Sequence, residues 1–178
     1  MNAILATAVA TLFALPVAAG AQQGGNPLAD ALRADLQRSQ RNLVGAAEAM
    51  PADKYGFKPT PAQMSFGQLV LHVAGSNEYM CSTISGAKQP DEAKLQPTDS
   101  KDKLVARLKR SFDYCGTALA SVDDSKLSET VPFFGGRTIS RAGAMLDLAA
   151  DWADHYGAAA VYLRLNGVLP PTAKRGEG

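Results

Sequence analysis

The stretch SFGQLVLHVAGSNEYMCSTISG, residues 65–86, has the pattern of one complete amphipathic helix. Ser65 followed by Gln68 is a capping-box pattern, which satisfies free backbone N–H groups where a helix starts. Gly86 is the kind of residue that commonly ends a helix. Apolar side chains recur between these ends at helical spacing: Phe66, Leu69, Val70, Val73, Met80 and Ile84. The stretch therefore predicts a helix with one face in a protein core.

Three other segments show regularly spaced apolar residues, at residues 26–50, 100–122 and 140–165. Residues suited to start or stop a helix lie at their ends: Asn26, Pro27, Pro51, Ser100, Ser140, Asn166 and Gly167. The polar residues 87–100 are long enough to form a crossover loop, and VPFFGGRTIS, residues 131–140, is expected to form a short extended pair. With no other strand pattern and no internal repeat, the sequence predicts an all-α four-helix bundle.

The composition indicates one domain and excludes one class of partner. The chain has 178 residues, of which 46% are hydrophobic, enough for a single core. Its formal net charge is +1 and its basic residues are scattered along the chain. A nucleic-acid-binding protein needs a concentrated positive surface, so we do not expect nucleic acid as a partner.

The N-terminal stretch MNAILATAVATLFALPVAAGAQQ is uncharged, with an apolar centre followed by small and then polar residues. This order predicts a secretory signal cleaved after Ala21, although no Lys or Arg precedes the apolar region. The alternative is an uncleaved membrane anchor, but the apolar run is of marginal length and Pro16 interrupts it. We expect a periplasmic or secreted protein without stable membrane insertion once the signal is removed. The predicted division is signal 1–21, linker 22–27, bundle 28–170 and disordered tail 171–178.

The two cysteines can form a disulfide bond if the protein is exported, because the compartment is then oxidising. Cys81 lies late in the second predicted helix and Cys115 in the third, so the two residues would meet if these helices are neighbours. The alternative is a pair of buried free thiols. Neither residue is part of a CxxC pair, which argues against a catalytic thiol.

The last predicted helix places Asp151 one turn before His155, in a sector that also contains Tyr162 and apolar residues. A buried imidazole and carboxylate are costly unless they are paired or bind a metal ion. His72, the only other histidine, flanks the apolar face of the second helix, and facing helices of bundles often build metal sites. We therefore predict a metal site of His72, Asp151 and His155, for Zn or Ni in the first place and for Mn or Fe as alternatives. A metal-free stabilising pair of Asp151 with His155 is the competing interpretation.

Two residues near this predicted site are candidates for proton transfer, Asp154 and Tyr162. Tyr162 is otherwise expected to lie in the core with its hydroxyl satisfied locally. Asp154 and Glu78 point away from the inferred inner faces. We therefore expect them to be solvated, or to contact the metal ligands without binding the metal themselves. Three further aromatic residues are interpreted as packing residues, with the lining of a pocket mouth as the alternative: Trp152, Phe133 and Phe134.

Two quoted stretches together resemble the DinB/YfiT-like superfamily: KPTPAQMSFGQLVLHVAGS, residues 58–76, and HYGAAAVYLRLNGVLPP, residues 155–171. The resemblance implies an up-down-down-up bundle with a metal ion held by three histidines, at the positions of His72, Asp151 and His155. It also implies a homodimer, because dimers are common in this superfamily. Members of the superfamily include thiol-dependent transferases and isomerases as well as proteins classed as metal-dependent hydrolases. Here Asp151 stands where the family usually has histidine, and Ala158 where a glutamine is common.

Two functional hypotheses follow for this chain. In the first, an exported DinB-like bundle binds one divalent metal ion and acts as a hydrolase or transferase on an unknown small molecule. In the second, a non-catalytic binding or structural bundle retains a degenerate site, in which Asp151 and His155 only pair with each other.

Overall fold

The structure is a computed structural model that describes residues 25–174. The predicted signal at residues 1–21 lies outside the described residues. No helix within the described part of the chain is long and apolar enough to span a membrane.

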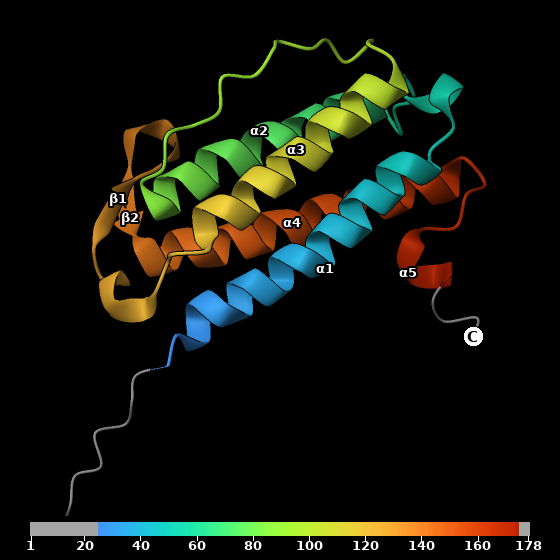
Figure 1. Ribbon diagram of the computed structural model, residues 1–178. Coiled ribbons are helices and arrows are strands. Elements are labelled where there is room, and N and C mark those ends of the chain that lie inside the picture. Colours follow the sequence, from blue (N-terminus) through green and yellow to red (C-terminus); the bar gives the residue numbers. More distant parts are fainter. Residues whose placement is uncertain (1–24, 175–178) are drawn as a thin grey trace, which may run out of the picture.

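The fold is the expected all-α bundle, built from four long helices: α1 (Pro27–Ala49), α2 (Phe66–Ser85), α3 (Lys101–Leu119) and α4 (Arg141–Leu165). Helices α1 and α4 run in one direction, and α2 and α3 run in the other (Figure 1). Two consecutive parallel helices need a long connection, and residues 87–100 return along the bundle to provide it, as the polar composition of this segment predicts. The topology is therefore up-down-down-up.

Local sequence signals set most helix ends. The Ser65 hydroxyl accepts a hydrogen bond from the backbone N–H of Gln68, and the Gln68 side chain accepts one from the N–H of Ser65, which confirms the predicted capping box. Gly86 ends α2 in the left-handed conformation, with φ of 77°, where glycine has no steric penalty. The Ser140 hydroxyl caps α4 by accepting from the N–H of Gly143.

The start of α1 differs from the prediction, because the cap comes from a distant residue and not from Asn26. The Asp124 carboxylate, in the short 3-10 helix η2 (Asp124–Lys126), accepts hydrogen bonds from the N–H groups of Leu28 and Ala29, each at 2.9 Å. The Asn26 side chain instead accepts from the backbone N–H of Asp124, at 3.1 Å. A carboxylate also suits the positive end of the helix dipole, so η2 and α1 stabilise each other.

Replacing Asp124 with alanine should lower the free energy of unfolding by about 1–2 kcal/mol, because two N–H groups at the α1 start lose their acceptor. Urea denaturation followed by circular dichroism measures this change. Asp91→Ala, in the exposed part of the crossover loop, is the matched control and should change stability little. Equal effects of the two variants would contradict the capping role.

The bundle core is a single apolar cluster to which all four long helices contribute. Within this cluster, three polar side chains form a connected series of hydrogen bonds. The Trp152 indole donates to the Asn77 side-chain oxygen at 2.7 Å, and the Asn77 amide donates to the Ser111 hydroxyl at 3.0 Å. These buried hydrogen bonds join α4, α2 and α3, and they fix the rotation of α4 next to Asp151. Trp152 is thus a packing residue, as predicted.

Two smaller elements complete the fold. Strands β1 (Thr130–Pro132) and β2 (Thr138–Ser140) form an antiparallel hairpin in which Val131 pairs with Ile139, confirming the predicted extended pair. The tail expected to be disordered from residue 171 begins with a short helix, α5 (Pro171–Lys174). The Tyr156 hydroxyl donates to the Thr172 hydroxyl at 2.8 Å and accepts from the Thr172 N–H at 3.0 Å, which fastens α5 to α4.

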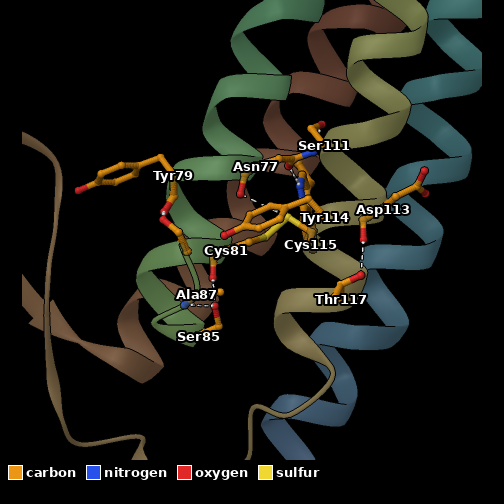
Figure 2. The surroundings of a disulfide bond; sticks show 12 residues. Asn77, Tyr79, Cys81, Ser85, Ala87, Ser111, Asp113, Tyr114, Cys115 and Thr117 are labelled. Carbon is orange, nitrogen blue, oxygen red and sulfur yellow. Dashed lines mark hydrogen bonds between the residues drawn. A yellow bond between two sulfur atoms is a disulfide. The ribbon is translucent and has the colours of Figure 1, made fainter. Parts of the chain in front are cut away.

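A disulfide bond joins Cys81 of α2 to Cys115 of α3, with Cα atoms 5.3 Å apart. Both cysteines are fully buried. Figure 2 shows the bond lying between the two helices. The predicted pairing is therefore confirmed, and the alternative of two free thiols is not observed.

Candidate metal centre

Three side chains from two antiparallel helices converge at one point of the bundle. His72 comes from α2, and Asp151 and His155 come from α4. One potential ligand atom from each of the three lies within 4.8 Å of the others. The two imidazole rings, far apart in sequence, have centroids 4.7 Å apart and are nearly perpendicular, at 88°. The convergence that the sequence predicts is thus present in the structure.

The helical repeat of α4 aligns its two contributions. Asp151 and His155 are one turn apart, and Asp151 Oδ1 lies 3.1 Å from His155 Nε2. Both side chains are largely shielded from solvent, with exposed fractions of 22% for Asp151 and 13% for His155. His72 is exposed, so the site lies at the surface of the bundle with one open side.

The electrostatic environment of His155 favours positive charge. The hydrogen bond that the His155 imidazole donates to the Asp151 carboxylate raises the pKa of His155, partial burial opposes this change, and the charges of Asp151 and Asp154 add to the increase. Two carboxylates beside a partly buried ring also attract a bound cation.

One oxygen of the site is left unsatisfied by the protein itself. Asp151 Oδ2 is buried and has no hydrogen-bond partner among the residues that the structure describes. A buried acceptor without a partner is costly and rare in folded proteins, and an ion or ordered water is a common explanation. The metal-free pairing of Asp151 with His155 accounts for Oδ1 and leaves Oδ2 unexplained. Two imidazole nitrogens and one carboxylate oxygen form a donor set suited to a divalent transition metal, so the residues present fit such an ion.

The two candidate proton-transfer residues lie in different places. The Asp154 side chain is 86% exposed, and its Oδ2 lies 3.8 Å from His155 Nδ1, beside the site. Tyr162 is two turns from His155, about 10 Å along the α4 axis, and is not part of the cluster. Its hydroxyl donates to the Met64 carbonyl at 2.8 Å, and burial raises the pKa of Tyr162. The local satisfaction expected for this hydroxyl is therefore observed.

The expectation of a solvated Glu78 is wrong. Glu78 is buried and forms a bidentate ion pair with Arg107 of α3, with Glu78 Oε2 at 2.5 Å from one guanidinium nitrogen. Arg107 was not identified from the sequence as the partner of Glu78. Its position three residues after Leu104 places it at the edge of the apolar face of α3, which is a sign of partial burial. Glu78 points away from the apolar stripe of its own helix, as its position predicts, but α3 lies on that side and buries it.

Comparison with known proteins agrees with the fold. A family model of the DinB superfamily matches residues 35–159. A DinB-like protein from Bacillus subtilis has a similar structure, with 19% identity over 77% of this chain and 92% of that chain and a TM-score of 0.63. A DinB-like protein from Bacillus cereus is similar over 80% of this chain and 95% of that chain, with 15% identity and a TM-score of 0.66. No curated protein matches the sequence significantly. Because the family model covers most of the sequence and the solved structures share its fold, the chain belongs to the DinB superfamily.

Proposed function

We propose that this protein binds one divalent transition metal ion through His72, Asp151 and His155 and acts on a small molecule as a metal-dependent hydrolase or transferase. The buried, unpartnered Asp151 Oδ2 beside two converging imidazoles is the observation that supports the proposal most directly. Zn is commonly bound by imidazole and carboxylate ligands, and affinity for such sites generally rises from Mn and Fe to Ni, so Zn and Ni are the first candidates and Mn and Fe the alternatives. When bound, the ion supplies Lewis-acid chemistry that polarises a substrate oxygen and promotes ionisation of water.

The residues around the site provide for substrate access, water exclusion and proton transfer. The open side next to His72 admits a substrate, while the bundle core excludes water from the Asp151 side. Asp154 is the residue placed to accept a proton, because its carboxylate is exposed and adjacent to His155. Tyr162 is less suited to proton transfer, since its hydroxyl is already engaged by the Met64 carbonyl.

Export is part of the same proposal. A disulfide between buried cysteines is typical of proteins that fold in an oxidising compartment, which supports a secretory role for residues 1–21. Mass spectrometry of the protein recovered from the periplasm or medium tests this, because cleavage after Ala21 leaves Gln22 as the first residue. A mature chain that retains Met1 would contradict it.

Protein purified without a histidine tag should contain close to one metal ion per chain, measured by elemental analysis. His72→Ala and Asp151→Asn should each weaken Zn or Ni affinity at least 100-fold in competition titrations, because each removes one of three ligands. Asp147→Ala is the matched control, since Asp147 is an exposed carboxylate one turn before Asp151 on α4. The control should bind metal like the unmodified protein.

The opposite outcome favours the second hypothesis. In a degenerate bundle, Asp151 and His155 retain their 3.1 Å contact without a metal ion. Such a protein would be purified free of metal, and added Zn or Ni would leave its melting temperature unchanged. Any ion that binds the native state alone must raise that temperature.

A further inference from the structure

An aromatic side chain lies on the same face of α2 as the metal-site histidine. Tyr79 follows His72 by seven residues, and seven residues make almost two full helical turns. The two side chains therefore leave α2 in nearly the same direction, about 10 Å apart along its axis. Figure 2 shows Tyr79 projecting from α2 on the side away from the disulfide.

The hairpin adds a second ring at this position. The Phe134 ring lies 4.3 Å from the Tyr79 ring, measured between centroids, and the two planes are inclined by 32°. The Phe133 ring packs edge-to-face against the Phe134 ring, with centroids 4.9 Å apart, and the Arg137 guanidinium lies 5.5 Å from the centre of the Phe133 ring. Arg137 also donates a hydrogen bond to the Phe134 carbonyl at 3.2 Å, so the turn that presents Phe134 is held in place.

The packing interpretation made for Phe133 and Phe134 applies to only one of them. Phe133 is buried at 7% exposure, whereas Phe134 is 44% exposed. A single exposed ring is common on protein surfaces and needs no explanation alone. Phe134 is unusual for its place, because it stacks on the one aromatic residue aligned with His72.

The surface between the histidine and the aromatic pair is open on the Gly75 side, whereas Ser76, the other residue between them on this face, is buried. Gly75 lies between His72 and Tyr79 on this face of α2 and is exposed. A Cβ atom added to Gly75 would meet no atom within 4 Å. A small molecule can therefore lie against the α2 backbone and reach both ends of this strip.

We infer that Tyr79 and Phe134 form an apolar subsite that selects substrates with two separated groups: a polar group that binds the metal ion and an aromatic or bulky apolar group about 10 Å away. This inference rests on the proposed metal site of His72, Asp151 and His155, and adds the substrate class. Aromatic rings are suited to this task, because they present large rigid surfaces and stack on other rings in offset or tilted arrangements.

Two synthetic metal-binding probes test the inference on the Zn-loaded, full-length mature protein. Acetohydroxamate has a metal-binding group alone, and the extended chain of 6-phenylhexanohydroxamate places a phenyl ring at about the same spacing from that group as Tyr79 has from His72. Calorimetric titration should show the phenyl probe binding at least tenfold more tightly than acetohydroxamate. Phe134→Ala should remove this advantage and leave the affinities for Zn and acetohydroxamate unchanged.

A second variant and a control separate recognition from general effects. Gly75→Leu should also remove the advantage, because its side chain occupies the strip while Phe134 remains in place. Leu165→Ala removes an even more exposed apolar side chain elsewhere, on α4, and should leave the advantage intact.

The possible failures are distinguishable. A protein that binds no Zn refutes the proposed function, and the inference with it. A protein that binds Zn but shows no preference for the phenyl probe, or keeps that preference in Phe134→Ala, refutes the subsite alone.

Discussion

Replacing Glu78 with alanine is expected to lower the free energy of unfolding by about 3–5 kcal/mol, a large effect for a charged residue. The reason is Arg107, whose side chain is only 11% exposed and whose guanidinium makes two hydrogen bonds to the Glu78 carboxylate. Without Glu78, the buried positive charge of Arg107 keeps a single ion-pair partner among residues 25–174, the more distant Glu92, whose Oε2 lies 3.8 Å from Arg107 Nε. Urea denaturation followed by circular dichroism and tryptophan fluorescence measures the loss.

A double variant separates the contribution of the ion pair to the free energy of unfolding from the cost of burying one unpaired charge. Glu78→Met combined with Arg107→Leu should lose much less stability than Glu78→Ala, because two apolar side chains of similar size need no partner. The exposed pair of Lys109 with Glu48 is the control, and Glu48→Ala should cost less than about 1 kcal/mol. If the single and double variants at the buried pair lose equal stability, the strong coupling described for Glu78 and Arg107 is absent.

The helices could be predicted from the sequence because their signals are local. Ser65 and Gln68 satisfy each other within one turn, and Gly86 ends α2 through its own backbone freedom. The long polar segment at residues 87–100 also implied a crossover, because a short loop cannot join parallel neighbours. Each of these features depends on residues that are close in the chain.

Contacts between distant segments could not be predicted in this way. The carboxylate that caps α1 belongs to Asp124, almost a hundred residues downstream, and nothing near Asn26 indicates it. The position of Glu78 on a helical wheel gives the direction of its side chain, but not what lies in that direction. The neighbour is α3, and so Glu78 meets Arg107 where solvent was expected.

The candidate metal site falls between these two cases. The pairing of Asp151 with His155 follows from the helical repeat. The place of His72 beside the apolar face of α2, together with the likeness to a known family, indicated it as the third member. The unsatisfied state of Asp151 Oδ2 depends on the burial of that one atom, which only the three-dimensional structure shows. That atom is the observation that favours a metal ion over a simple acid–histidine pair.

Reduction of the Cys81–Cys115 disulfide is expected to lower the free energy of unfolding by about 4 kcal/mol in the chain-entropy account. The bond spans 34 residues, and this loop restricts the unfolded chain much more than the folded one. Urea denaturation with and without dithiothreitol measures the difference, and alanine at both positions should reproduce most of it. Counting thiols under denaturing, non-reducing conditions should find none in protein from the periplasm, and two reactive thiols there would refute the bond.

Comparing the oxidised and reduced proteins also shows whether the disulfide is needed for the metal site or only for the stability of the bundle. Cys81 and His72 lie on one helix, so loss of the disulfide could displace the histidine. However, α2 is also held to α4 by the buried hydrogen bond between Trp152 and Asn77, which does not involve sulfur. We therefore expect the reduced protein, at urea concentrations where it remains folded, to bind Zn with unchanged affinity. A tenfold or greater loss of affinity on reduction would show instead that the disulfide, and not the polar core, positions His72.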